Sequence, residues 1–205
     1  MKRRSRIELL LKYAEDVQHM EIFRDYELAV ESRTVPEFLP VRIKNLCENL
    51  RSVLDYLAQE IWESFGKKAG RRPKIYFPIE SSRRRFEDRT DRLFPHLRKR
   101  APELFAFLER IQPFPDSGEE WLARFKHLNN RSKHFDLVLH QSRTAPVGSS
   151  AAASLGPVVH LDQRSGEWVE FRFVEPPTNA FMLVDMAVVG VRHIQMELAL
   201  HLPWN

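Results

Sequence analysis

The chain has 205 residues, 43% of them hydrophobic and 29% charged, a composition that excludes a disordered or low-complexity protein. One cysteine, Cys47, excludes a disulfide scaffold and a multi-cysteine zinc site, and is typical of a reducing compartment. The net charge is +4, but residues 67–100 alone carry +9 and the remainder carries −5. We therefore expect a single cytoplasmic domain, residues 1–205, with one strongly basic segment.

Apolar periodicity predicts two long helices at the start of the chain. Residues 5–31 contain neither Pro nor Gly, and their apolar residues recur every three or four positions. Val35-Pro36 ends this helix, and a second helix runs from about Pro40 to Phe65, with Gly66 as its stop. The apolar stripe of the second helix consists of Leu46, Leu50, Val53, Leu54, Leu57 and Ile61.

Shorter elements follow a basic loop at 67–79 that ends in the letters YFPI. Two short helices are expected near 82–93 and 102–111, and a capping-box pattern at Ser117 and Glu120 opens another helix that ends near His134. The period then changes to that of strands at 137–140, 158–161 and 168–174, with a hairpin turn at 162–166 and a mobile loop at 144–156.

The closing helix, about 179–201, is apolar on two sides. One stripe consists of Leu183, Ala187, Val191, Ile194 and Leu198, and the other of Met182, Val189, Met196 and Leu200. Such a helix is either central in its bundle or faces a partner subunit. The helix contains several charged residues, so we expect no membrane span. The sequence predicts a mainly α protein, a helical bundle with a small antiparallel β insert at about 137–174 before the C-terminal helix, and a homodimer formed through that helix.

The basic segment suggests a ligand that bears phosphate. Residues 67–100 contain thirteen Lys or Arg and four acidic residues, and arginine can contact a phosphate through two hydrogen bonds at once. The candidate binding residues here are Arg83, Arg84 and Arg85. The alternative is an ordinary solvated helix face.

A polar stripe on the helix that ends at His134 is the candidate catalytic group. Arg124, His127, Arg131 and His134 follow one another at steps of three or four residues, with Asn130 beside them. His134 or His127 would be the acid or base, Arg131 and Arg124 would hold phosphate, and Asn130 would orient the ligand. The alternative is that these side chains cap the helix end. The two histidines lie about 10 Å apart along a helix, so we expect no metal, and no glycine-rich loop suggests a cofactor.

The second helix carries one candidate ion pair and the single cysteine of the chain. Arg51 and Asp55 are four positions apart, which predicts an ordinary surface ion pair. If Arg51 instead faces the stripe of Arg124 and His134, the two helices build a shared polar pocket. Cys47 lies near the apolar edge of the same helix and is expected to be a buried small hydrophobe rather than a nucleophile.

Four motifs carry a resemblance to known proteins. Asn49-Leu-Arg-Ser-Val-Leu-Asp-Tyr-Leu-Ala58, Tyr76-Phe-Pro-Ile79, Ile111-Gln-Pro-Phe114 and Leu128-Asn-Asn-Arg-Ser-Lys-His134 occur in this order. Over residues 45–140 the chain resembles a group of uncharacterised bacterial proteins, from which no activity can be carried over. More distantly, it is similar to HEPN-type helical bundles, many of which are dimeric, metal-independent ribonucleases or partners of nucleotidyltransferases. Their signature separates Arg from His by four to six residues, whereas only two residues separate Arg131 from His134 here.

Two interpretations of function follow. The first is a bacterial helical-bundle module that engages RNA or nucleotides through the basic segment and the His/Arg stripe; if it is an enzyme, the resemblance implies a metal-independent ribonuclease. The second is a non-catalytic, dimeric interaction or structural protein whose polar stripe only supports the fold.

Overall fold

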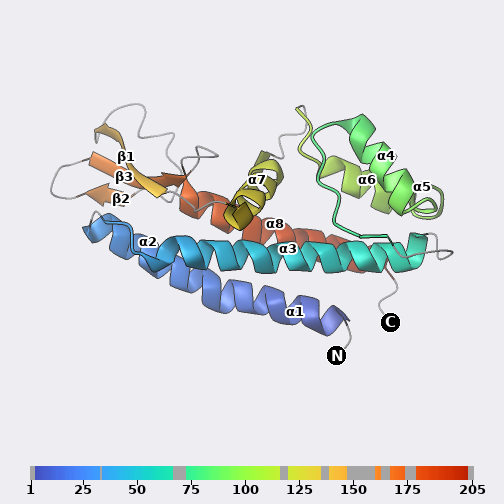
Figure 1. Cartoon of the computed structure of the whole chain (residues 1–205), viewed down its shortest axis with the longest axis horizontal. Coiled ribbons are helices and arrows are strands. Elements are labelled where there is room, and N and C mark those ends of the chain that lie inside the picture. Colours follow the sequence, from blue (N-terminus) through green and yellow to red (C-terminus); the bar gives the residue numbers. More distant parts are fainter. Residues whose placement is uncertain are drawn as a thin grey trace.

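The computed structural model describes residues 3–32, 34–66, 73–115, 120–134, 139–146, 160–162, 167–173 and 179–202. Its helices alone account for more than half of the 205 residues, which confirms a mainly helical protein. Long helices lie side by side along the molecule, and the shorter elements cover one side and the two ends (Figure 1). Among the described helices, none is both long and apolar enough to cross a membrane.

The first long helix forms as predicted but contains a π-helical segment. It consists of α1 (Arg3–Tyr13), the π-helix η1 (Ala14–His19) and α2 (Met20–Ser32), which follow one another without a break. A π-helical turn shifts the phase of the helix, so the residues that follow it are turned relative to α1. Within η1, Gln18 is buried and accepts a hydrogen bond from the amide of Asn49 at 3.0 Å. The π-helical segment therefore joins the first helix to the second.

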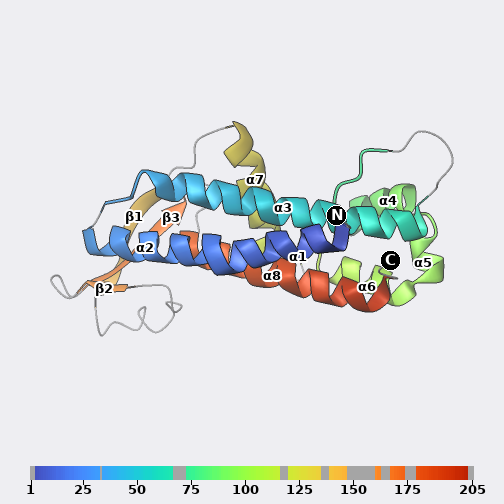
Figure 2. The ribbon, with the colours of Figure 1, turned by 90° about the horizontal axis from the view of Figure 1, so that it is seen from below.

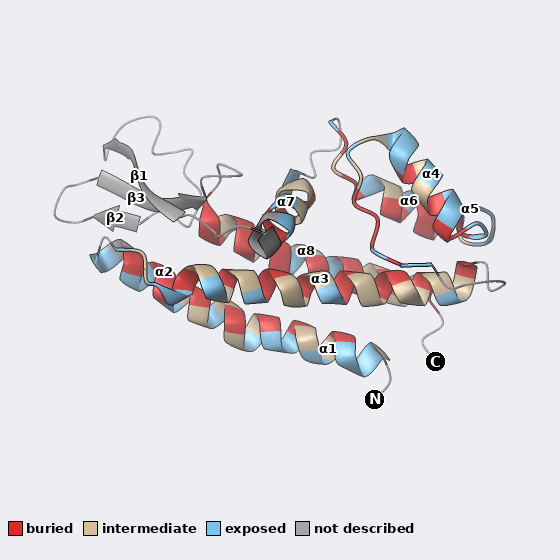
Figure 3. Cartoon of the chain, in the orientation of Figure 1, coloured by how far each residue is buried: buried red, intermediate tan, exposed pale blue. Residues whose placement is uncertain are grey.

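The second long helix, α3 (Phe38–Phe65), is the centre of the bundle. It packs against α1, η1, α2, α7 and α8, and Figure 2 shows α1 and α8 running alongside it. Every residue of its predicted apolar stripe is buried, and red patches of buried residues recur along the length of α3 in Figure 3. A Cβ on Gly66 would lie 2.4 Å from Cδ1 of Trp62. Close approach of this indole, rather than a left-handed backbone, explains the glycine at the end of the helix.

Three short helices gather beside the C-terminal end of α3: α4 (Arg83–Leu93), α5 (Leu97–Arg100) and α6 (Pro102–Arg110). The hydroxyl of Ser82 caps α4 by accepting a hydrogen bond from the backbone N–H of Arg85 at 3.4 Å. The helix α5, a single turn between Pro95 and Pro102, was not predicted.

The helix α7 (Glu120–His134) contacts α3 and α8 and crosses them in the middle of the molecule (Figure 1). Phe125 and Leu128 are buried, whereas Ser117 of the expected capping box lies outside the described residues. Trp121 lies directly over Gly190 of α8, so that a Cβ on this glycine would be 2.4 Å from Cζ2 of the indole. The absence of a side chain at Gly190 therefore allows α7 to approach α8 this closely.

Three strands are described between α7 and α8: β1 (Leu139–Pro146), β2 (His160–Asp162) and β3 (Glu167–Phe173). The sheet has the order β1-β3-β2 and is antiparallel, with Leu139 opposite Phe173 and His160 opposite Val169. Because β1 continues to Pro146, the first three residues of the predicted loop at 144–156 belong to a strand, and Thr144 and Pro146 are paired with Trp168 and Glu167 of β3. The rest of that loop and residues 163–166 of the predicted turn lie outside the described residues.

The last helix, α8 (Ala180–His201), begins at Asn179, whose side chain accepts a hydrogen bond from the N–H of Met182 at 2.8 Å. Its first predicted stripe, from Leu183 to Leu198, is buried. The second is largely exposed: 61% of Val189, 59% of Met196 and 77% of Leu200 are accessible to solvent. The helix is therefore not enclosed within its own chain.

Arg192 of α8 joins the last helix to the first. It donates hydrogen bonds to Glu15 at 2.7 Å and to Glu8 at 3.0 Å, and Gln195 donates a further one to Glu8 at 3.0 Å. Hydrogen bonds to the two carboxylates, above all that of Glu15, raise the pKa of Arg192. The two ends of the sequence thus meet through a charged cluster at the surface of the bundle.

Cys47 is buried, as predicted, and its thiol should be inert in the folded protein. Loss of hydration on burial raises the pKa of Cys47 to about 12, and a protonated thiol is a poor nucleophile. We expect no reaction with Ellman's reagent at pH 8 in buffer and rapid reaction in guanidinium chloride. Because the thiol ionises more readily when unfolded, its contribution to stability should fall as the pH rises from about 9 towards 12. Rapid labelling of Cys47 by Ellman's reagent in the native protein would contradict the prediction of an inert thiol.

Candidate functional site

A polar pocket of about 260 Å³ lies where α3, α4, α7 and the loop before α4 meet. We call it the α3–α7 pocket. Its lining residues are Arg51, Asp55, Tyr76, Phe77, Ile79, Arg89, Lys126 and Asn130. Three of the four sequence motifs contribute side chains to it, and the fourth supports its floor.

The pair formed by Arg51 and Asp55 anchors the pocket to α3. Arg51 donates to the two carboxylate oxygens of Asp55 at 2.7 and 3.2 Å, and the side chains are only 16% and 21% exposed. Asp55 also accepts a hydrogen bond from the backbone N–H of Phe77 at 2.9 Å. The predicted ion pair between Arg51 and Asp55 is confirmed, but it is not an ordinary surface pair. Both side chains are largely buried, and the carboxylate of Asp55 also holds a distant loop against the helix.

The loop that carries YFPI forms the floor of the pocket and is fixed from behind by Gln112. This amide is completely buried; it donates to the carbonyls of Pro78 and Leu108 and accepts a hydrogen bond from the N–H of Glu80 at 2.9 Å. Since a buried amide is costly unless its hydrogen bonds are made, Gln112 selects this loop conformation. The Gln-Pro motif therefore acts beneath the pocket rather than in it.

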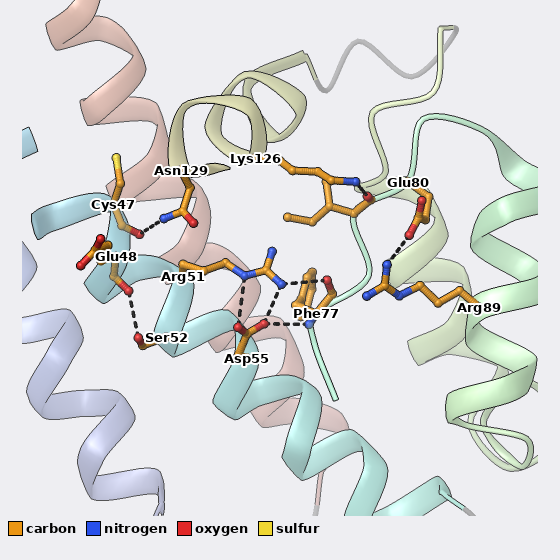
Figure 4. Close-up of polar contacts among 11 residues, drawn as sticks. Cys47, Glu48, Arg51, Ser52, Asp55, Phe77, Glu80, Arg89, Lys126 and Asn129 are labelled. Atoms are coloured by element: carbon orange, nitrogen blue, oxygen red, sulfur yellow. Dashed lines mark hydrogen bonds and ion pairs between the residues drawn. The ribbon is translucent and has the colours of Figure 1, made fainter. Parts of the chain in front are cut away.

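Two further cationic side chains enter the pocket from the other helices. Lys126 of α7 donates a hydrogen bond to the carbonyl of Ile79 at 2.5 Å, and Arg89 of α4 forms an ion pair with Glu80 at 2.6 Å. In Figure 4, Arg51, Lys126 and Arg89 reach towards the same space from three different elements. Three cations and two acids, Asp55 and Glu80, leave this region with one net positive charge.

Asn129 fixes the position of α7 over α3. It is buried and donates a hydrogen bond to the carbonyl of Cys47 at 3.0 Å. Its neighbour Asn130 is exposed and lines the pocket, as does Lys126 four residues earlier on the same helix face. The first asparagine of the Asn-Asn motif is therefore structural, whereas the second is available to a ligand.

Of the predicted His/Arg stripe, the two members with described side chains, Arg124 and His127, do not line the pocket. His127 is exposed, and Arg124 pairs with Glu120 at 2.5 Å. The side chains of Arg131 and His134 lie outside the described part of the chain. Of the candidate site residues on α7 whose side chains the structure describes, Asn130 alone shares the pocket with Arg51, and the catalytic roles assigned to the histidines stay a prediction.

The basic segment is only partly neutralised within the fold. Arg83 pairs with Glu109 at 2.5 Å and Arg98 with Glu87 at 3.1 Å. Arg84 and Arg85 are exposed, and within the described residues neither side chain has an ion-pair partner. The cationic residues at 67–72 lie outside the described residues.

No known family model, curated protein or solved structure matches this chain. In the described ranges, no group of three or more His, Cys, Asp or Glu side chains is arranged to hold a metal ion. What the α3–α7 pocket offers a ligand is a set of fixed cationic N–H donors beside a partly exposed tyrosine, Tyr76.

Proposed function

We propose that this protein binds single-stranded RNA, with a phosphate group in the α3–α7 pocket. The observation that carries the proposal is the convergence of Arg51, Arg89 and Lys126, which come from three separate elements, on one small pocket. Two of these cations are held by carboxylates behind them, Asp55 and Glu80. A cation whose orientation is fixed in this way can bind an anion without losing further conformational freedom.

A row of arginines on α4 supports a ligand longer than one phosphate. Arg85, Arg89 and Arg92 are spaced by four and three residues, so they lie along one helix face, and Arg89 is the member that enters the pocket. Arg85 and Arg92 are exposed. A strand with one phosphate in the pocket could therefore place neighbouring phosphates along this row.

The salt dependence of RNA binding tests this proposal. We expect the double variant Arg85→Gln/Arg92→Gln to bind a single-stranded RNA more weakly, with the slope of log K against log salt reduced by about 1.4, because each lost contact to a single strand removes about 0.7. Fluorescence anisotropy at several salt concentrations measures both quantities. The matched control is Arg24→Gln/Lys99→Gln, which removes the same charge from exposed positions on α2 and α5, outside the row. An equal loss in both variants, or no salt-dependent affinity in the wild type, would contradict the proposal.

The exposed stripe of α8 favours a second candidate function, that of a dimeric interaction protein. Together with Met186 and His193, the members of this stripe follow the 4-3-4-3-4 spacing of a coiled-coil seam, and apart from the half-buried Met182 all of these side chains are exposed. They are Met182, Met186, Val189, His193, Met196 and Leu200. Contiguous exposed apolar side chains on a helix are typical of an interface.

Light scattering tests the dimer directly. At tens of micromolar we expect a mass of about twice the 24.2 kDa of one chain, and we expect Val189→Glu to return the protein to the monomer because it places a charge in the seam. Arg84→Glu, on the exposed face of α4, is the control and should stay dimeric. A wild-type mass near that of one chain would rule the dimer out. RNA binding and dimerisation are compatible with each other.

The proposal also includes a small β insert, a HEPN-like architecture and a cytoplasmic location. The antiparallel register of β1 with β3 supports a small β insert within a single domain, and the mainly helical architecture is compatible with a HEPN-like bundle. The single buried Cys47 suits a cytoplasmic protein. Exchange of backbone amides with deuterium tests the insert, since paired strands at 139–146 and 167–173 would exchange slowly.

A further inference from the structure

Each of the three cations in the α3–α7 pocket keeps unused hydrogen-bond donors. Within the described residues, Arg51 uses Nε and Nη2 for its bonds, which leaves Nη1, and Arg89 uses Nη1 for its bond to Glu80, which leaves Nη2. Lys126 donates to one carbonyl, whereas an ammonium group carries three N–H bonds. The pocket therefore presents unmade donors from three directions.

Donors from three directions match the terminal phosphate of an RNA strand better than a phosphate in the middle of that RNA strand. A terminal phosphate monoester has three non-bridging oxygens, whereas a backbone diester has two and needs room for the chain to leave on both sides. The inner side of the pocket is closed by Phe77 and Ile79, which are each 1% exposed and whose backbone is held by Asp55 and Lys126. A strand can consequently enter this pocket but not pass through it.

Tyr76 stands at the open side of the same pocket. Its side chain is 46% exposed, and the guanidinium carbon of Arg51 lies 6.0 Å from the ring centroid. An exposed aromatic ring beside a phosphate site is a stacking surface for a nucleic-acid base. A phosphate among the cations and a base on the tyrosine together describe one terminal nucleotide.

We infer that the α3–α7 pocket binds a terminal nucleotide through its phosphate monoester, so that the protein recognises a phosphorylated RNA end. The inference rests on the proposed RNA binding, and it adds that the row of Arg85 and Arg92 follows the strand away from that end. A free nucleoside monophosphate shares this chemistry, and the experiment must separate the two sources.

The test compares ten-nucleotide single-stranded RNAs that differ only in one terminal phosphate. Anisotropy is measured for a 3′-labelled RNA with a 5′-phosphate or a 5′-hydroxyl, and for a 5′-labelled RNA with a 3′-phosphate or a 3′-hydroxyl. We expect the phosphate at one of the two ends to tighten binding about 10- to 100-fold, as charge-assisted hydrogen bonds to three donors allow. Lys126→Gln and Tyr76→Ala should each reduce this ratio. The control Lys99→Gln, exposed on α5, should keep it.

The possible outcomes separate the inference from the function on which it rests. Equal affinity for phosphorylated and hydroxyl RNAs overturns end recognition and leaves RNA binding in place. If adenosine monophosphate binds and RNA does not, the terminal phosphate site stands and the RNA function is overturned. If neither binds, both are overturned. The circular dichroism and melting temperature of Lys126→Gln and Tyr76→Ala exclude unfolding as the cause of a reduced ratio.

Discussion

Replacing Asp55 by alanine should lower the free energy of unfolding by about 2–3 kcal/mol, although both partners of its ion pair lie on one helix. The substitution leaves the guanidinium of Arg51, 16% exposed, without its carboxylate, and it leaves the N–H of Phe77 without an acceptor. Urea unfolding followed by circular dichroism measures the loss. The loop that carries Phe77 should also become more sensitive to proteolysis.

The chain contains a matched control for this prediction. Glu120 and Arg124 form another i,i+4 pair, at 2.5 Å, but their side chains are 73% and 38% exposed and the pair is on the surface of α7. We expect Glu120→Ala to cost less than about 0.5 kcal/mol, because exposed pairs contribute little. If Asp55→Ala and Glu120→Ala were equally mild, the role of Asp55 in holding the loop would be refuted.

Gly190→Ala is expected to destabilise the protein even though alanine is the better helix former. The added Cβ would lie 2.4 Å from the indole of Trp121, which is too close for any contact between heavy atoms that are not bonded. Overpacking of this kind costs about 1–3 kcal/mol, while the gain in helix propensity is about 1 kcal/mol. Relief of the clash must move α7, so Lys126 and Asn130 should shift with it and ligand binding in the α3–α7 pocket should weaken.

A double-mutant cycle isolates the clash from other effects. In the Trp121→Leu background the large ring is absent, so Gly190→Ala should stabilise the protein through helix propensity alone. The sign of the effect of Gly190→Ala on the urea midpoint thus depends on residue 121. Destabilisation of the same size in both backgrounds would show that contact with the indole is not the cause.

The long helices could be predicted from the sequence because their apolar residues repeat at helical spacing, and this periodicity directly reflects burial. The stripe from Leu46 to Ile61 and the stripe from Leu183 to Leu198 are buried as expected. The π-helical segment at Ala14–His19 was missed because it changes the hydrogen bonding of the backbone without interrupting the run of helix-forming residues. The turn at Leu97–Arg100 was missed because a four-residue helix is too short to show a period.

The pocket was only partly predictable, since it depends on which faces of α3 and α7 meet. Arg51, Asp55 and Asn130 were considered from the sequence, but Lys126 and Arg89 were not singled out. On α7 the spacing of His127 and His134 was conspicuous, whereas Lys126 and Asn130 form an ordinary i,i+4 pair. A signal was nevertheless present, because the motifs that contain Arg51, Tyr76 and Asn130 come together at one place in the fold.

The charged cluster around Arg192 has a consequence for how the protein is made. Glu8 and Glu15 are synthesised before α8, and the residue that joins them to this helix is separated from Glu8 by 184 positions. At 5–20 residues per second, the ribosome needs roughly 10–40 s to supply it. During that time the surface of the first helix that will contact α8 has no partner from its own chain. Nascent-chain chaperones therefore have a defined segment to protect, and C-terminal truncations that remove α8 should leave that segment prone to aggregation.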